Sequence, residues 1–184
     1  MFYEGWSRRS LDQIALQRKG VMPLSPKPEF PPLLPIGFHE MTLPVLRELC
    51  VGKFAGSQTR STIMAGVEAV VGRLDECGLQ AEVWVDGSFL TAKRNPNDSD
   101  LVVFYDSELH EYGTPEQREV LDWIGGNLRN SAHICDSYLA PRFPKGSEHE
   151  VYGQYLYSYW HRQFGFSRGD DMKGIAVLMT GRQA

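Results

Sequence analysis

The sequence predicts an α/β (α+β) fold in which helices flank a mixed four-stranded sheet. Two observations carry this prediction: helical and strand patterns interchange along most of the chain, and several helical patterns begin with capping residues. The composition agrees, because 42% of the 184 residues are hydrophobic and 23% are charged, as is usual for a globular domain. The predicted order is helix, helix, strand, strand, helix, strand, helix, strand. This order is not strict βαβ alternation and therefore favours a mixed sheet.

The first 29 residues are predicted to form an arm outside this domain. Positions 10–19 fit a short helix that Gly20 ends, and six of the eleven prolines follow between Val21 and Pro35. A proline-rich stretch is typical of an extended connector. We therefore expect an arm at 1–29, either loosely attached or used for self-association or for binding a protein partner, and a domain at 30–184.

Two helices are predicted before the first strand. Thr42 and Pro44 open a short helix, and Ser57 precedes a longer one that Gly78 ends. Apolar residues recur at helical spacing in both, so each helix has one face for a core. These residues are Leu43, Leu46 and Leu49 in the short helix and Ile63, Met64, Val67, Val70, Val71, Leu74 and Cys77 in the long one.

Four short apolar runs predict the strands. One further helix is predicted between the second and third runs, and another between the third and fourth. The runs lie at 81–86, 101–105, 132–139 and 173–179. The first of the two further helices begins at a capping box formed by Thr114 and Gln117 and ends at Gly125. The second begins at a similar pattern formed by Ser147 and Glu150.

The last predicted helix carries an aromatic stripe and ends at Gly165. Tyr152, Tyr155, Tyr159 and Trp160 recur on one of its faces. The stripe either packs half-buried against the sheet or stacks a nucleic-acid base. The large apolar area of aromatic side chains favours packing.

Acidic residues are concentrated in one segment of the chain. The net charge is −4, but positions 98–122 hold eight acidic residues and one basic residue, a net of −7 that leaves +3 elsewhere. A mildly acidic chain argues against a general DNA or RNA coat, which needs a basic surface. Asp98 and Asp100 of this segment are candidate ligands, and we expect its other six acidic residues to lie on the surface.

Motifs that the sequence lacks exclude several classes of protein. No GxxxxGK[ST], GxGxxG or HExxH pattern occurs, and the GxSxG string at 165–169 follows a predicted helix and not the strand that a nucleophile elbow requires. Cys50, Cys77 and Cys135 are widely spaced and odd in number, which argues against a disulfide framework or a zinc knuckle. No apolar run reaches the roughly 18 residues of a membrane span, and the first residues lack a signal-peptide pattern. We therefore expect a cytoplasmic protein with no membrane partner.

The most informative segment is VWVDGSFLTAKRNPNDSDLVVFYD at 83–106. A strand ends in Gly87 and Ser88, nine residues follow, and Asp98 and Asp100 then lead into the next strand. Gly87 lets a bulky anion approach the backbone, and Ser88 adds a hydroxyl donor. Residues two apart in an extended chain point the same way, so Asp98 and Asp100 present two carboxylates on one face. A Mg²⁺–triphosphate complex needs oxygen ligands arranged in this way.

This pattern resembles the nucleotidyltransferase superfamily, which includes DNA polymerase beta and the minimal nucleotidyltransferases of bacterial toxin–antitoxin systems. The segments DGS at 86–88 and DSDL at 98–101 match its Gly-[Gly or Ser] and Asp-x-[Asp or Glu] motifs. Two positions depart from the motifs: Ser99 stands where an apolar residue is usual, and Asp86 places an acidic residue before the glycine. More closely, the chain resembles an uncharacterised family of small bacterial and phage proteins of this fold. That likeness excludes the arm and lies at 30–40, 96–100, 159–160, 164–165 and 173–175.

The resemblance implies a minimal nucleotidyltransferase-like fold with a third catalytic carboxylate on a neighbouring strand. Asp136 is the best match, because it follows Asp100 by 36 residues, which leaves room for one intervening helix. Asp106 is a competitor, but it stands at the far end of its strand. Asp98, Asp100 and Asp136 would then hold two Mg²⁺ (or Mn²⁺) ions together with a bound NTP.

Basic side chains are expected to complement the triphosphate beside Gly87 and Ser88. Lys93 and Arg94 lie in the loop between the two motifs and are candidates for nucleotide binding. Lys173 is a third candidate. Arg142 and Arg168 are the alternatives to it in the C-terminal half of the chain.

The function that these expectations describe is the transfer of a nucleoside monophosphate from an NTP to a hydroxyl acceptor, with release of pyrophosphate. The acceptor would be a protein side chain, a tRNA end or a small molecule. The alternative is a catalytically silent binding module of the same fold, for instance one component of a toxin–antitoxin or phage-defence pair.

Overall fold

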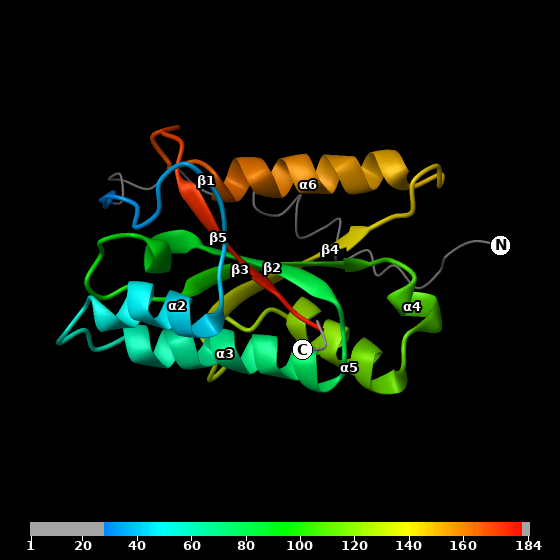
Figure 1. The fold of residues 1–184 in the computed structure, drawn as a ribbon, viewed down its shortest axis with the longest axis horizontal. Helices are drawn as coiled ribbons and strands as arrows, with labels where there is room; N and C mark the ends of the chain where they lie inside the picture. Colours follow the sequence, from blue (N-terminus) through cyan, green and yellow to red (C-terminus); the bar gives the residue numbers. More distant parts are fainter. Residues whose placement is uncertain (1–27, 182–184) are drawn as a thin grey trace.

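The computed structural model of the protein describes residues 28–181 of the 184. The helix predicted at 10–19 and nearly all of the arm at 1–29 lie outside the described residues. The described part forms one five-stranded sheet with helices on both faces (Figure 1). None of the helices within it has the length and apolar character that crossing a membrane requires.

The sheet is mixed, as predicted, and its strand order is β1-β5-β2-β3-β4. β2 runs antiparallel to both of its neighbours, whereas β1 pairs with β5, and β3 with β4, in parallel. The strands span Gly37–Glu40 (β1), Ala81–Asp86 (β2), Ser99–Asp106 (β3), Cys135–Arg142 (β4) and Gly174–Met179 (β5).

β1 is absent from the sequence prediction, so the predicted count of four strands is wrong. Its four residues, GFHE, lie at the edge of the sheet and are mostly exposed, so they show no apolar alternation. The strand is defined by its parallel pairing with β5, in which Phe38 lies beside Ile175. A strand of this kind depends on its partner more than on its own sequence.

Helices cover both faces of the sheet and create two buried cores (Figure 1). α6 (Glu150–Phe164) lies on one face, and α2 (Leu43–Arg47), α3 (Arg60–Glu76) and α5 (Pro115–Gly125) lie on the other. The larger core lies between the sheet and α3 and α5. The smaller core, between the sheet and α6, contains Trp84, Val102, Phe104, Ala140, Trp160, Phe164, Ile175 and Val177.

Short helical turns and helix termini complete the fold. The short turns are a π-helical turn at Glu48–Gly52, a 3₁₀ turn at Gly87–Leu90 and α4 at Leu109–Tyr112. The predicted capping box of α5 is confirmed, because the amide of Gln117 donates to Thr114 Oγ1 (3.2 Å) and the amide of Thr114 donates to Gln117 Oε1 (3.0 Å). The predicted cap at Ser147 is wrong. Its hydroxyl is buried without a hydrogen-bond partner among the described residues, and the amide of Glu150 donates to the Ser147 carbonyl instead.

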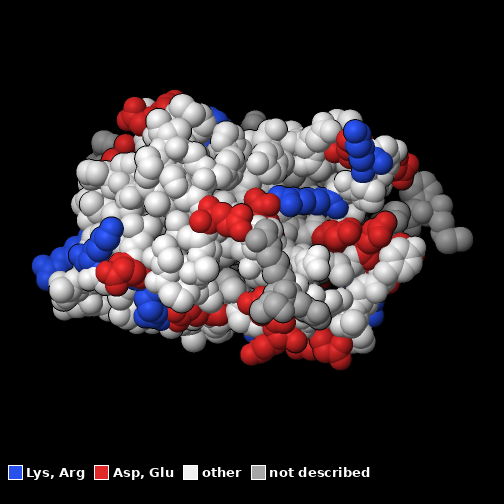
Figure 2. Space-filling model, in the orientation of Figure 1, with Lys and Arg blue, Asp and Glu red and all other residues white. Residues whose placement is uncertain are grey.

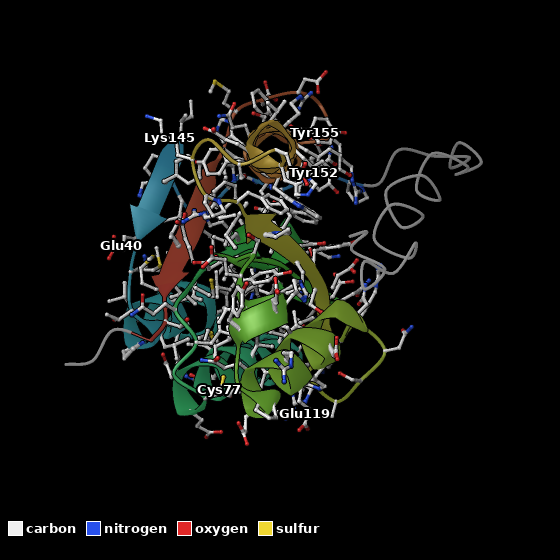
Figure 3. All side chains as sticks on the ribbon, turned by 90° about the vertical axis from the view of Figure 1, so that its right-hand side faces the viewer. Glu40, Cys77, Glu119, Lys145, Tyr152 and Tyr155 are labelled. Atoms are coloured by element: carbon white, nitrogen blue, oxygen red, sulfur yellow. The ribbon has the colours of Figure 1, made fainter. Side chains whose placement is uncertain are left out.

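The aromatic stripe of α6 divides between core and surface. Trp160 is buried against Tyr138, with ring centroids 4.6 Å apart. Tyr155 is 53% exposed and lies between Tyr152 and Tyr159 along the helix, with ring centroids 6.4 and 6.3 Å away. Figure 3 shows Tyr152 and Tyr155 beside α6, across the sheet from Cys77 and Glu119. The packing interpretation therefore describes Trp160, whereas Tyr155 belongs to the surface.

The acidic segment at 98–122 is mostly surface, as the sequence predicts. Acidic side chains gather along the edge of the molecule where α5 lies (Figure 2). All six acidic residues of the segment other than Asp98 and Asp100 are exposed: Asp106, Glu108, Glu111, Glu116, Glu119 and Asp122. Asp98 and Asp100 are partly buried, which sets them apart from the rest of the segment.

Candidate functional site

The pairing of β2, β3 and β4 places three carboxylates in a row. Asp86 is the partner of Asp100 in the antiparallel β2–β3 pair, and Asp136 is the partner of Asp100 in the parallel β3–β4 pair. Partnered residues on neighbouring strands point to the same face, with strands about 5 Å apart. Trp84 and Val102, two residues along from Asp86 and Asp100, belong to the core under α6, so the row lies on that face of the sheet.

Asp98 completes the group, because it stands two residues before Asp100 and therefore on the same face. We call Asp86, Asp98, Asp100 and Asp136 the carboxylate cluster. The cluster lies where β2 ends and where β3 and β4 begin. The structure thus brings together the three predicted ligands, Asp98, Asp100 and Asp136, and adds Asp86.

Gly87 is the residue that allows β2 to turn beside the cluster. Its φ is +81°, in the left-handed region that favours glycine. A Cβ at this position would lie 1.8 Å from Oδ2 of Asp100, so the bare Cα also leaves the space that this carboxylate occupies. Ser88 follows in the 3₁₀ turn, and its carbonyl accepts a hydrogen bond from Thr91 Oγ1 at 2.9 Å.

Substitution of Gly87 by alanine is expected to displace Asp100 and, at the metal site that the sequence predicts, to abolish Mn²⁺ binding. The strained backbone alone costs about 1–3 kcal/mol of the free energy of unfolding, and the collision with Asp100 adds to this cost. Gly78→Ala is the matched control, because Gly78 has a φ of +64° and nothing within 4 Å of an added Cβ. Urea unfolding and Mn²⁺ titration of both variants check the prediction. Equal losses of stability with unchanged Mn²⁺ affinity in both variants would contradict it.

A buried ion pair joins Asp86 to Lys173, just before β5. The Lys173 ammonium donates to both oxygens of Asp86, at 2.7 and 2.5 Å. Burial raises the pKa of Asp86 to about 6, although Lys173 and the amide of Gly87 act in the opposite direction. Lys173 also acts electrostatically on Asp100, lowering its pKa. The structure therefore places this predicted phosphate ligand beside the cluster.

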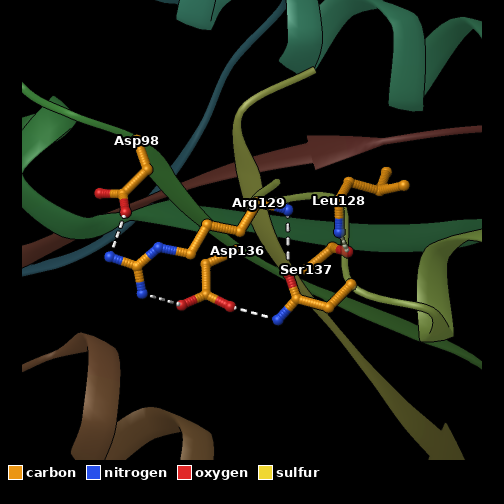
Figure 4. A network of polar contacts seen from close by, with 6 residues as sticks. Asp98, Leu128, Arg129, Asp136 and Ser137 are labelled. Atoms are coloured by element: carbon orange, nitrogen blue, oxygen red, sulfur yellow. Dashed lines mark hydrogen bonds and ion pairs between the residues drawn. The ribbon is translucent and has the colours of Figure 1, made fainter. Parts of the chain in front are cut away.

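Arg129 bridges Asp98 and Asp136 of the cluster (Figure 4). Its Nη2 lies 2.8 Å from Oδ2 of Asp98, and its Nη1 lies 3.3 Å from Oδ2 of Asp136. Asn127 closes the network: its side-chain amide donates to Oδ1 of Asp136 at 2.5 Å, and its Oδ1 accepts from the amide of Arg129 at 2.9 Å. Asn127 has a φ of +60°, a conformation that asparagine tolerates better than most residues. The α5–β4 loop therefore folds around Asp136.

The pKa of Asp100 is raised to about 7. The largest cause is desolvation by burial, although part of the residue remains accessible. The neighbouring carboxylates of Asp86, Asp98 and Asp136 raise it further, and Lys173 opposes them. The cluster thus has more negative charge than its own basic residues offset, which is the electrostatic condition that favours a bound cation.

This raised pKa predicts that the metal-free protein loses stability as the pH rises from about 4 to about 7. In that window the folded state keeps a proton on Asp100 that the unfolded state has released. The stabilising contribution of this proton is complete below the pKa of Asp100 in the unfolded state, and it is lost as the pH rises through the pKa of Asp100 in the folded state. Asp100→Asn removes this loss. In EDTA, the free energy of unfolding of the variant minus that of wild type should rise by on the order of 2 kcal/mol between about pH 4 and about pH 8. Urea unfolding at both pH values measures the gain, and parallel pH profiles for the two proteins would contradict the prediction.

Arg60, at the start of α3, holds the loop between the two motifs. The side chain is fully buried and donates to four carbonyls. These are the carbonyls of Cys50 (2.8 Å), Phe89 (2.8 Å), Thr91 (2.6 Å) and Lys93 (2.7 and 3.2 Å). The guanidinium also lies 3.6 Å from the ring centroid of Phe54. No carboxylate pairs with it among the described residues, and desolvation lowers its pKa.

Asn95 ties the same loop to the beginning of α3. Its Oδ1 accepts from the Ser57 hydroxyl (3.1 Å) and from the amide of Gln58 (3.0 Å). The Ser57 hydroxyl in turn accepts from the amide of Arg60 at 3.2 Å, which agrees with its predicted place before the helix. The loop that leads to Asp98 is therefore positioned by α3 as well as by the two strands.

The remaining predicted site residues lie at different distances from the cluster. Arg94 is exposed and donates to the carbonyl of Gly56 at 3.3 Å, on the α3 side of the loop. Lys93 is half-buried, and its carbonyl is one of the acceptors of Arg60. Arg142 pairs with Glu82 at the far end of β4 from Asp136. Asp106 is exposed and accepts from the amide of Glu108 at 2.9 Å, away from the cluster at the other end of β3.

The cluster fits a divalent cation by its chemistry but is closed by its own basic residues. Within residues 28–181, no three His, Cys, Asp or Glu side chains converge as a ready metal centre. Arg129 engages Asp98 and Asp136, and Lys173 engages Asp86. The carboxylates are nevertheless the hard oxygen ligands that Mg²⁺ and Mn²⁺ prefer. The donor set therefore fits such an ion, and two of its members, Asp98 and Asp136, are engaged by Arg129 in this structure.

Sequence reasoning missed Arg60, Asn127 and Arg129 as parts of the site, and it treated Asp86 only as a departure from the motif. Arg60 does carry a signal, since it precedes Ile63 by three residues and Val67 by seven and so shares their buried face of α3. Nothing local marks Asn127 or Arg129, because their partners lie on strands that only the folded sheet brings near.

Comparison with known proteins gives a family match. The model of a family described as "Family of unknown function (DUF6932)" matches residues 28–179. This stretch includes every member of the carboxylate cluster and both of its basic partners. No curated protein and no solved structure matches the chain.

Proposed function

The chain belongs to the family of unknown function DUF6932, and we propose that it is a metal-dependent nucleotidyltransferase. In this proposal it moves a nucleoside monophosphate from an NTP to a hydroxyl acceptor on a protein, a tRNA or a small molecule. The observation that carries the proposal is the row of Asp86, Asp100 and Asp136 across three neighbouring strands, with Asp98 on the same face and the Gly87 turn against Asp100.

Each residue of the site has a role in this reaction. Asp98, Asp100 and Asp136 would hold two Mg²⁺ or Mn²⁺ ions, which supply charge stabilisation to the attacking and leaving oxygens. Gly87 and Ser88 offer a close approach for the β- and γ-phosphates. Lys173 lies next to the cluster and places a positive charge near them.

The proposed reaction needs a base for the acceptor hydroxyl, and Asp136 is our candidate for this role. The acceptor oxygen forms a bond to the α-phosphorus, the bond from that phosphorus to the bridging oxygen breaks, and pyrophosphate leaves. The acceptor hydroxyl must lose its proton during this step. Asp136 is 8% exposed, so it is shielded from bulk water yet reachable from the surface of the site, and we assign it the orientation and deprotonation of the acceptor.

A catalytically silent binding module is the second candidate function. It is favoured by the closure of Asp98 and Asp136 onto Arg129, which leaves no three converging ligands among the described residues. Such a module would use the same fold to hold a partner, for instance in a two-component toxin–antitoxin or phage-defence pair.

A transfer assay separates the two functions. The purified protein is incubated with each NTP labelled at the α-phosphate, with Mg²⁺ or Mn²⁺, and with cell extract as the source of acceptors. We expect label to move to an acceptor with release of pyrophosphate, and EDTA to abolish the transfer. If no label moves under any condition while a stable partner co-purifies with the protein, the binding module is the better account.

A further inference from the structure

The guanidinium of Arg129 stands between two carboxylates that are less exposed than it is. The Arg129 side chain is 52% exposed, whereas the side chains of Asp98 and Asp136 are 15% and 11% exposed. By these exposures the arginine covers Asp98 and Asp136 from the solvent side. Figure 4 shows its guanidinium between the two carboxylates. This arrangement differs from that of Arg60, which is fully buried and held by four carbonyls.

The contact that Arg129 makes can be exchanged for another cation. Water solvates the half-exposed guanidinium, whereas Asp98 and Asp136 are largely shielded from water and need a positive partner when the arginine leaves. Asp136 keeps a second partner if the arginine leaves, since Asn127 donates to its Oδ1 and Arg129 contacts its Oδ2. The carboxylate would thus stay oriented while Oδ2 becomes available.

The formal charge of the cluster indicates that Arg129 is needed as a counter-charge when no metal ion is bound. The four carboxylates of the cluster have a formal charge of −4, and Lys173 and Arg129 together contribute +2, so the closed site has a formal charge of −2. A divalent cation between Asp98 and Asp136 would neutralise them more fully than one guanidinium does. The same oxygens cannot serve both cations at close range, because like charges a few ångströms apart repel strongly.

We propose that Arg129 is an internal competitor of the metal: it holds Asp98 and Asp136 in the metal-free protein and is released when a divalent cation binds. Once released, its guanidinium faces solvent beside the cluster, where it is available to an anionic group such as a phosphate. This inference rests on the metal site of the proposed function and concerns how that site is regulated.

Two measurements test it, both with the full chain. The first is the affinity for Mn²⁺ alone, measured by calorimetry for wild type, Arg129→Gln and Arg142→Gln. Arg142 is the matched control: it lies six residues from Asp136 on the same strand, it is 47% exposed, and it pairs with Glu82. We expect Arg129→Gln to bind Mn²⁺ about tenfold more tightly than wild type, and Arg142→Gln to change the affinity by about twofold or less.

The second measurement needs no substitution. Phenylglyoxal modifies accessible guanidinium groups, and peptide mass spectrometry reports the extent at each arginine. We expect saturating Mn²⁺ to increase the modification of Arg129 several-fold while that of Arg142 stays constant. This readout remains available even if Arg129→Gln folds poorly.

The outcomes separate this inference from the proposed function. If Mn²⁺ binds wild type while neither the affinity of Arg129→Gln nor the modification of Arg129 changes, the inference is overturned and the metal site stands. If Mn²⁺ binds neither wild type nor any variant, the inference about Arg129 and the metal site of the proposed function are both overturned. If both changes occur but no NTP label is transferred, the inference stands and the nucleotidyltransferase assignment fails.

Discussion

Replacing Asp98 or Asp100 with asparagine is expected to reduce nucleotidyl transfer by about 10²- to 10³-fold. An amide has nearly the same shape as a carboxylate but carries no charge, so the variant keeps the packing of β3 and loses a metal ligand. For Asp100 the loss should accompany a gain of stability in EDTA near pH 8, because the raised pKa shows that the ionised carboxylate is costly there. A gain in stability together with a loss in activity is the expected sign of a functional residue.

The measurement is the transfer of label from α-labelled NTP in the presence of Mn²⁺, at matched concentrations of folded protein. Asp106→Asn is the control, because Asp106 stands on the same strand, six residues from Asp100, and is exposed. It should retain transfer within about twofold of wild type, as expected for a surface position. Transfer that survives both Asp98→Asn and Asp100→Asn would refute the assignment of the metal site.

Arg60→Met is expected to have the largest effect on stability, a loss of about 3–5 kcal/mol from the free energy of unfolding. The substitution leaves the four carbonyls of Cys50, Phe89, Thr91 and Lys93 without this donor in a buried place. Unsatisfied buried carbonyls cost free energy because water no longer reaches them. Urea unfolding followed by tryptophan fluorescence measures the loss.

Two further variants make the Arg60 prediction specific. Arg73→Met lies on the same helix, where Arg73 is partly exposed and pairs with Glu119 at 3.7 Å, so it should cost about 1 kcal/mol or less. Arg60→Lys keeps the charge but not the planar fork of donors, and it should fall between the two. A loss after Arg60→Met no larger than that after Arg73→Met would show that the buried guanidinium does not hold the loop.

The consequence of Arg60 for function follows from what it holds. Its carbonyl partners Phe89, Thr91 and Lys93 lie in the loop that joins Gly87 to Asp98. Partial loss of these bonds would let Asp98 move relative to Asp100. Arg60→Lys should therefore weaken Mn²⁺ binding more than its loss of stability alone predicts. The effect would be indirect, because the Arg60 side chain donates to backbone carbonyls and not to the carboxylate cluster.

The strands could be predicted where their own residues carry the pattern. AEVWVD and the following LVVFY run are apolar enough to be recognised, and the structure places β2 and β3 there. β1 could not, because GFHE is short, exposed and held by its parallel pairing with β5. The predicted cap at Ser147 was wrong for a related reason. A capping pattern indicates only that the serine side chain is able to accept from the helix, and here the amide of Glu150 donates to the Ser147 carbonyl instead.

By itself the sequence determined the part of the site that lies within one hairpin. Gly87 directly follows β2, Asp98 directly precedes β3 and Asp100 lies in β3, so all three belong to one pair of adjacent antiparallel strands and the loop between them. The two-residue period of an extended chain is a local property. Only the tertiary structure decided the rest. Asp136 reaches Asp100 through the parallel β3–β4 pairing, and Lys173 reaches Asp86 from 87 residues away. Arg129 closes the cluster from a loop after α5. These contacts depend on strand order and register, which are set by the burial of both sheet faces and not by any local spacing.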